Sequence, residues 1–220
     1  MVSEHNEKSA FKKALVATVI LFLVGVSLGV FIESWRSQAV KDKYEELEFE
    51  LLDAKLRTDF YSLMDQDFCQ IAIDDNLKFS DKIYEEGKKI DVYEKFNRLG
   101  DRLGDEKQKY TLLKTEFWLN SILLRDKCDS DYSTVVYFYK DDPATDEEKQ
   151  KINVQSKILG DLKEKYGADI MLIPLPIDLG VSVVDSFVLF HDIDEVPTIL
   201  INEEIKLEGL HDLEEIEKLI

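Results

Sequence analysis

The chain of 220 residues contains few of the groups that enzymes use for chemistry. It has two cysteines and three histidines, and the histidines are far apart in the sequence. It has no H-E-x-x-H zinc motif, no G-x-S-x-G nucleophile motif and no glycine loop of the kind that cradles a phosphate. These absences exclude the commonest hydrolase and nucleotide-binding sites, and we expect no cofactor.

Proline and glycine are also scarce, with four and nine residues. A disordered stalk would be richer in both, so we expect an ordered chain. Acidic residues outnumber basic ones by 46 to 28, which gives a net charge of −18. Such a surface repels phosphate groups and argues against a nucleic-acid partner. It suits a basic partner, divalent cations or simply solubility.

Residues 14–32 form an apolar run, ALVATVILFLVGVSLGVFI, without an ionisable side chain. About 20 such residues in a helix cross a hydrocarbon core of about 30 Å. Lys12 and Lys13 precede the run, and Trp35 with Arg36 follows it, as interfacial residues do. A cleaved signal peptide would have a shorter apolar region and a small-x-small cleavage site. We therefore predict a short tail (1–13) and an uncleaved, single-pass transmembrane helix that contacts the lipid bilayer.

The charges around the run bear on its orientation. Basic residues are equally numerous on its two sides, but the lysines before it lie closer to it. The positive-inside rule then favours a cytoplasmic N-terminus and an extracytoplasmic body. Gly25 and Gly29 form a G-x-x-x-G, a spacing that lets two membrane helices approach closely. Glycines four apart are common in such segments, so the motif leaves both a homodimer and a monomer open.

Beyond the membrane, residues 33–127 are predicted to be helical and partly coiled-coil-like. Two apolar stripes run along the first helix. The first is a heptad seam, consisting of Val40, Tyr44, Leu47, Leu51, Ala54, Thr58 and Tyr61. The second runs beside it and consists of Phe49, Leu52, Leu56, Phe60 and Leu63. One seam alone would indicate a coiled-coil dimer, whereas two leave open whether the helix packs on its own chain or on a second copy.

Two further helices are expected in this segment. One lies within residues 68–99, and Gly100 and Gly104 mark the turn that follows it. The next covers about residues 105–125 and has an apolar face too wide for a surface helix. We expect that face to be buried against the C-terminal domain.

The pattern changes in residues 128–220, where β-branched and aromatic residues predict strands. Thr145 and Glu148 form a capping box, in which each side chain bonds the backbone of the other. The expected elements alternate as β-α-β-α-β-β-α, which implies a mixed sheet with helices on both faces. They are strands 133–139 and 170–173, helices from 146 to 167 and over 181–190, a hairpin of 199–202 with 205–208, and a helix over 212–220. The apolar run 181–190 also fits a strand.

The end of the chain resembles the second half of thioredoxin. The segment Ile193-Asp194-Glu195-Val196-Pro197-Thr198 is followed by ILIN, a hairpin, Gly209 and a terminal helix. The resemblance covers about residues 131–220 and implies an α/β thioredoxin-like domain. It also implies that Pro197 is cis and that Val196, Pro197 and Thr198 line a groove for an extended polypeptide.

The chain departs from that family at the redox site. Thioredoxins carry C-x-x-C between the first of these strands and the following helix, where the helix N-terminus lowers the thiol pKa. Here residues 140–148 read KDDPATDEE and contain no cysteine. Because thiol–disulfide exchange needs an attacking thiolate, this site is predicted to be redox-silent.

The two cysteines, Cys69 and Cys128, leave three interpretations open. In an extracytoplasmic body they would form one structural disulfide. In a cytosolic body they would be free and buried. They could also form a spaced redox pair, which would make the protein a thiol–disulfide oxidoreductase or its accessory subunit.

The acids on either side of the expected groove form a possible rim for a cation or a basic partner. In thioredoxin-like folds the first loop and the segment before the cis-proline meet, so carboxylates from both would lie together. Such oxygens could bind Ca²⁺, although a solvated acidic loop explains them equally. They are Asp141, Asp142, Asp146, Asp192, Asp194 and Glu195.

The sequence thus favours a membrane-tethered, redox-silent binding or scaffolding module that engages a protein or peptide partner. The alternatives are the oxidoreductase described above and a purely structural protein that dimerises. Whether the protein is an enzyme stays open, with the evidence leaning against it.

Overall fold

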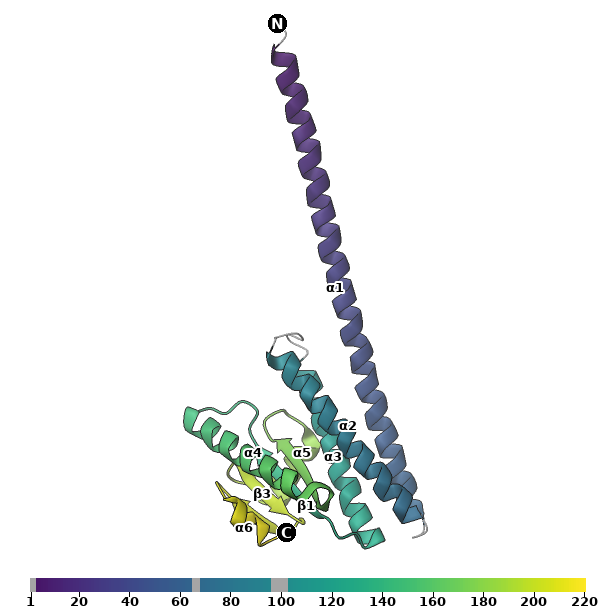
Figure 1. Ribbon diagram of the computed structural model, residues 1–220, viewed down its shortest axis with the longest axis vertical. Helices are drawn as coiled ribbons and strands as arrows, with labels where there is room; N and C mark the ends of the chain where they lie inside the picture. The colour runs from purple at the N-terminus through teal and green to yellow at the C-terminus, as the bar shows by residue number, and fades with distance from the viewer. Residues whose placement is uncertain (1–2, 65–67, 96–102) are drawn as a thin grey trace. The chain divides into compact units, whose positions relative to one another are not determined.

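The computed structural model describes residues 3–64, 68–95 and 103–220, and the side chains of 12–32 and of all described residues from 47 onward. The chain is mostly helical, with one small mixed sheet of four strands (Figure 1). It divides into two compact units, residues 1–46 and 47–220, which are described separately.

The first unit carries the apolar run. Helix α1 (Ser3–Leu63) contains the segment Lys12–Ile32, 21 residues with a mean hydropathy of 2.8 and no buried residue. Within it the hydroxyl of Thr18 donates to the carbonyl of Ala14 at 2.9 Å, so this polar group is satisfied inside the helix. By length and composition this helix can cross a membrane. The predicted interfacial side chains of Trp35 and Arg36 lie outside the described residues.

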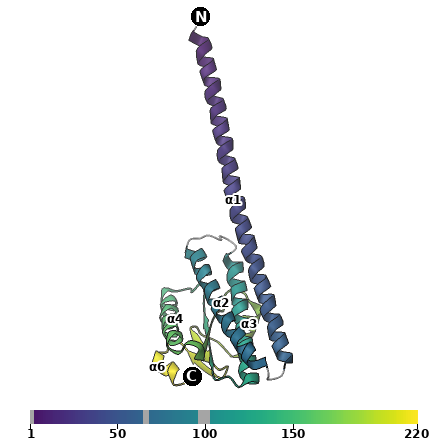
Figure 2. The same ribbon diagram turned by 45° about the vertical axis from the view of Figure 1, so that its right-hand side comes forward.

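Three helical segments form one layer of the second unit: the end of α1, α2 (Cys69–Lys95) and α3 (Leu103–Cys128). Figures 1 and 2 both show α2 and α3 side by side. Buried amides join them, because Asn76 donates to the hydroxyl of Ser121 at 3.0 Å and accepts from Asn120 at 2.8 Å. The ammonium of Lys127 donates to the carbonyls of Tyr61, Ser62 and Met64 and so caps the end of α1.

The two apolar stripes of α1 have different environments. In the predicted seam Leu47, Ala54 and Tyr61 are 1%, 3% and 7% exposed, and Leu47 and Ala54 share a core with α2, α3 and the sheet. The seam therefore packs on its own chain. The second stripe is exposed. The side chains of Val40 and Tyr44 lie outside the described residues.

The sheet has the order β2-β1-β3-β4, with β1 and β2 parallel and the other pairs antiparallel. Its strands are β1 (Ser133–Tyr139), β2 (Ile170–Pro176), β3 (Thr198–Ile201) and β4 (Ile205–Glu208). Pro174 and Pro176 lie in β2, at one edge of the sheet. Because proline has no N–H to give to the ladder, both fit an edge strand and reduce its capacity to pair with another chain.

Helices cover both faces of the sheet, as predicted. Trp118 and Phe187, from α3 and α5 (Ser182–Phe190), pack against the face that carries Phe138. Helices α4 (Asp146–Tyr166) and α6 (Leu213–Glu217) pack against the other face through Leu159 and Ile216. Because α3 shares a core with the sheet, residues 47–220 form one compact unit without a boundary between 127 and 128.

The structure corrects three local predictions. Gly104 lies inside α3 instead of in the turn before it, and Gly100 is outside the described residues. Thr145 accepts from the amide of Glu148 at 3.1 Å, as expected for an N-cap, but the Glu148 carboxylate accepts from the amide of Ala144 instead of Thr145. Strand β2 continues three residues beyond Ile173, because parallel pairing with β1 extends to Pro176.

Candidate functional site

The C-terminal end of β1 and the N-terminal end of β3 lie side by side at one end of the sheet. Phe138 is paired with Thr198, so the loop after β1 and the segment before β3 are neighbours. The Val196–Pro197 peptide bond is cis, as predicted. The hydroxyl of Thr198 donates to the carbonyl of Glu195 at 2.6 Å, and the amide of Gly209 donates to the carbonyl of Pro197 at 2.8 Å. These bonds hold residues 195–198 in place.

Within residues 195–198, Val196 differs from its neighbours in its backbone hydrogen bonding. Pro197 and Thr198 are buried, whereas Val196 is half-buried. Among the described residues, neither the N–H nor the C=O of Val196 has a hydrogen-bond partner. A donor and an acceptor without partners on one partly exposed residue can pair with an extended chain in the manner of a β-strand.

The loop that follows β1 is anchored by charged side chains. The carboxylate of Asp178 accepts from the amides of Asp141 and Asp142 at 2.8 and 2.9 Å. The ammonium of Lys107 donates to both carboxylate oxygens of Asp141, at 3.0 and 2.8 Å, and to Glu94 at 2.9 Å. Burial alone would lower the pKa of Lys107, but the bonds to these two acids outweigh it and raise that pKa. The sequence analysis found neither Asp178 nor Lys107, because both lie far from the loop along the chain.

A cavity of about 580 Å³ lies beside this loop, between α4 and the first two strands. Its floor includes the rings of Tyr137 and Tyr139, which stack with centroids 5.3 Å apart. Asn153 and Ser156 of α4 line it opposite the rings. Burial raises the pKa of Tyr139. The cavity is large enough for one or two side chains of a bound polypeptide.

The six acids proposed as a rim do not form a metal site. Asp141 is paired with Lys107, and the carbonyl of Asp192 accepts from Lys206 at 2.7 Å. Over residues 3–64, 68–95 and 103–220 the structure contains no group of three or more His, Cys, Asp or Glu residues that could hold a metal ion. The cation interpretation thus has no structural support, and the basic-partner interpretation stays a prediction.

Of the three interpretations of the two cysteines, the structure shows the disulfide. The sulfur atoms of Cys69 and Cys128 lie 1.98 Å apart, and the chain has no free cysteine. This disulfide joins the first residue of α2 to the last residue of α3. Cys128 precedes the beginning of β1, whereas Pro197 lies beside its end. No thiol is available at the groove.

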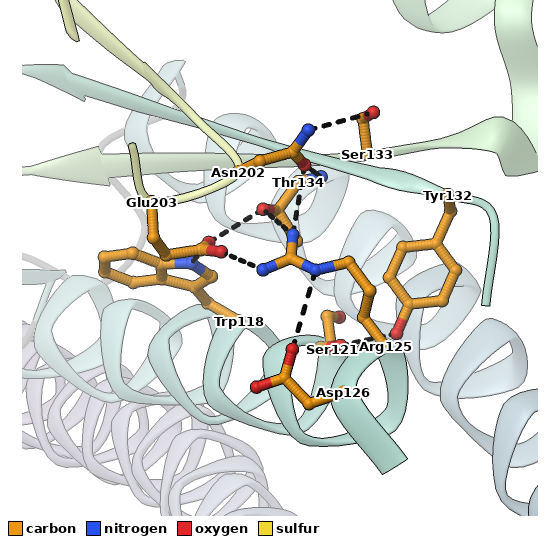
Figure 3. Close-up of polar contacts among 9 residues, drawn as sticks. All are labelled: Trp118, Ser121, Arg125, Asp126, Tyr132, Ser133, Thr134, Asn202 and Glu203. Atoms are coloured by element: carbon orange, nitrogen blue, oxygen red, sulfur yellow. Dashed lines mark hydrogen bonds and ion pairs between the residues drawn. The ribbon is translucent and has the colours of Figure 1, made fainter. Parts of the chain in front are cut away.

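A second cluster, which the sequence analysis missed, lies where β1 begins (Figure 3). Arg125 of α3 donates to Thr134 and Asn202, each at 3.0 Å, and to the carboxylate of Glu203. The other oxygen of Glu203 accepts from the indole of Trp118 at 2.6 Å and from the hydroxyl of Thr134 at 2.7 Å. The cluster joins α3, β1 and the β3–β4 turn.

The cluster also explains the backbone of that turn. Asn202 and Glu203 have φ of 50° and 62°, left-handed values that favour glycine. The side-chain oxygen of Asn202 accepts from the backbone N–H of Thr134 at 2.9 Å, and the backbone N–H of Asn202 donates to the carbonyl of Thr134 at 2.9 Å. We interpret the cluster as a structural connection between the helical layer and the sheet.

Substitution Glu203→Gln is expected to lower the free energy of unfolding by about 2 kcal/mol, because hydrogen bonds to a charged group contribute about 1.5–3 kcal/mol. The amide keeps the shape of the carboxylate but presents an N–H donor to the donors of Arg125, Trp118 or Thr134. Urea unfolding followed by tryptophan fluorescence measures the change. Glu204→Gln is the matched control, since Glu204 is exposed, and equal effects of the two substitutions would contradict the structural role of Glu203.

Comparisons with known proteins add little. No protein-family model and no curated protein matches the chain. Among solved structures, it is similar to one described as a malarial protein, at 18% identity with a TM-score of 0.33, over 40% of this chain and 92% of that one. A likeness at this level carries no argument about fold or function.

Proposed function

We propose that the protein is a membrane-tethered, non-enzymatic binding module with a thioredoxin-like domain, and that it holds an extended polypeptide in the groove beside Pro197. The observation that carries the proposal is the free backbone of Val196 next to a cis-proline. Chaperone-like and scaffolding roles both fall under it.

The fold assignment rests on the resemblance of residues 131–220 together with element order. Strand β1 is followed by α4, β2, α5, the β3–β4 hairpin and α6, with helices on both faces of the sheet. The cis bond before Pro197 lies where the resemblance puts it. The absence of a cysteine between residues 140 and 148 supports a binding role over thiol exchange.

The groove favours a basic, extended segment. When a bound peptide pairs as a strand with the N–H and C=O of Val196, every second side chain of the peptide points to the same face and can contact the protein surface there. The loop after β1, which is the neighbour of this segment, also borders the cavity floored by Tyr137 and Tyr139. Asp194 lies two residues before Val196 and Asp142 lies in the loop after β1, and both are exposed. The net charge of −18 would draw a basic partner towards the protein.

The tether is the apolar segment Lys12–Ile32. We propose that it spans the membrane once, with the N-terminus in the cytoplasm and residues 47–220 on the extracytoplasmic side. The Cys69–Cys128 disulfide supports this orientation, because disulfides persist in oxidising compartments and are rare in the cytosol.

Photo-crosslinking of the full-length protein in detergent micelles tests the groove. A benzophenone amino acid replaces Glu195, beside the cis-proline, or Glu204, beyond the other end of β3; both side chains are exposed. Each variant is incubated with a pool of unstructured 15-residue peptides of net positive charge. We expect labelling from position 195 to exceed labelling from position 204 by about tenfold, as an oriented site would give.

Two outcomes would count against the groove. Equal labelling from both positions would show diffuse attraction to an acidic surface, and no labelling from either would show that the groove binds no such peptide. A pool with the same apolar residues but net negative charge tests the preference for basic segments, and we expect it to label weakly.

A further inference from the structure

The second apolar stripe of α1 lies on the surface of the unit formed by residues 47–220. Its five side chains are 45–79% exposed. At about 100° of rotation per residue they lie within a sector of about 80°, so they form one narrow line along the helix. We call this line the outer stripe; it consists of Phe49, Leu52, Leu56, Phe60 and Leu63.

The outer stripe has no partner helix among the described residues. The neighbouring seam, with Leu47 and Ala54, is the face that packs into the core. Of the outer stripe, Phe60 meets Phe68, with ring centroids 6.0 Å apart. Five large apolar side chains in a line on an acidic protein form the kind of patch that marks an interface.

The flanks of the stripe carry charges that match a second copy. On one flank Asp53 and Arg57 lie one turn apart and form an ion pair at 3.2 Å. On the other flank Lys55 and Asp59 are exposed, and neither forms an ion pair within the described residues. When two such helices lie side by side and parallel, the first flank of each faces the second flank of the other. Asp53 then lies opposite Lys55 of the second copy, so opposite charges meet there, whereas the guanidinium of Arg57 lies 5.6 Å from the ring centroid of Phe79 in its own chain.

The geometry points to a second copy of this chain as the occupant: we propose that two chains pair in parallel through their outer stripes. The proposal uses the membrane tether proposed above, because two helices that leave the same membrane on the same side are held parallel and at high local concentration. Stable pairs bury about 800 Å² per partner. The five exposed side chains of the stripe supply the apolar part of such an interface, and the flanking side chains supply the remainder. This surface differs from the seam that the sequence indicated.

Cysteine crosslinking in liposomes that contain the full-length protein tests the pairing. The native cysteines are bonded to each other, so an introduced cysteine is the only free thiol. Leu56→Cys lies at the centre of the stripe, and Ser62→Cys is an exposed control on the same helix, about 120° away around the axis. Under mild oxidation we expect a disulfide-linked dimer from Leu56→Cys at about ten times the yield from Ser62→Cys. Equal yields would overturn the proposal.

A second set of variants separates the outer stripe from the membrane helix. Leu52→Gln with Leu56→Gln should abolish pairing measured by fluorescence transfer between labelled chains, whereas Gly25→Leu with Gly29→Leu should leave it in place. The reverse pattern would assign any dimer to the G-x-x-x-G face and overturn the proposal. Unchanged helical circular dichroism and an intact Cys69–Cys128 bond show that the variants fold. Peptide labelling at position 195 is independent of this result, so the proposed peptide binding and the proposed pairing can be contradicted separately.

Discussion

Reduction of the Cys69–Cys128 disulfide is expected to lower the free energy of unfolding by about 4 kcal/mol, the loop-closure value for cysteines 59 residues apart. The bond joins the start of α2 to the end of α3, so it restricts the unfolded chain across both helices. Next to it, Lys127 caps the end of α1 through backbone carbonyls, including that of Met64 at 3.0 Å. Reduction therefore loosens the place where all three helical segments meet.

Urea unfolding of the full-length protein in detergent micelles, with and without reductant, measures this loss. Trp118 is 1% exposed and reports on the core; a Trp35→Phe background removes the other signal. Cys69→Ala with Cys128→Ala is the control, and its unfolding midpoint should not respond to reductant. An unchanged midpoint after verified reduction of the wild-type protein would contradict the prediction.

Local patterns were sufficient for most of the fold. Strand β1 has the predicted bounds because STVVYFY is β-branched and aromatic throughout. The first strand of the hairpin begins and ends one residue earlier than predicted, and the second has the predicted bounds. Helix α4 ends at Tyr166, and the expected Gly167 is its C-cap, with a φ of 53° that suits glycine. In each case the determining residues lie within a few positions of the element.

Which stripe of α1 faces inward could not be predicted, because both are apolar and both have helical spacing. The structure resolves it through residues distant in sequence. Phe79 and Phe117, from α2 and α3, share the core with the seam residue Ala54. A helical period identifies a face, but only the position of its neighbours decides whether that face is covered.

The candidate site could be predicted only in part. The cis-proline followed from the resemblance carried by residues 193–198 and the elements after them, whereas the groups that anchor the neighbouring loop come from α3 and from the segment after β2. The acidic rim was predicted on the assumption that loop acids meet one another. In the structure Asp141 instead meets Lys107, because a pairing of opposite charges is favoured over a cluster of like charges.

Lys114 is a buried lysine whose burial could not be predicted from the residues around it in the sequence. It lies on α3, is 3% exposed, and its ammonium sits 4.5 Å from the ring centroid of Tyr110. Among the described residues no carboxylate forms an ion pair with it, although Asp141 and Asp91 act on it from a distance. Burial lowers the pKa of Lys114 from 10.5 to about 7, and these two acids offset only part of that effect.

This shift makes stability depend on pH. The unfolded chain holds the Lys114 proton up to about pH 10.5, whereas the folded chain releases it near pH 7. Between these values the unfolded state binds more protons, so stability rises with pH. Lys163, whose pKa burial also lowers, contributes in the same direction. Below pH 7 His191, whose pKa is lowered by burial, can titrate as well.

Substitution Lys114→Met is therefore expected to stabilise the protein by up to about 5 kcal/mol at pH 7 and below, since each pKa unit corresponds to about 1.36 kcal/mol. Methionine has a similar volume and brings no charge into the core. The gain should shrink steadily towards pH 10, because the free energy needed to remove the proton that Lys114 keeps in the unfolded chain falls as the pH approaches 10.5. Taking the difference between wild type and variant removes the contribution of Lys163, which both proteins share.

Urea unfolding at unit pH intervals from 7 to 10 measures the difference, with ionic strength held constant by a monovalent salt. Lys157→Met, at an exposed position of α4, is the matched control and should follow the wild-type curve. Parallel curves for wild type and Lys114→Met would mean that Lys114 keeps its proton in the folded state. In that case Asp141 and Asp91 would compensate its burial fully, and removing either acid should then destabilise the protein most at neutral pH.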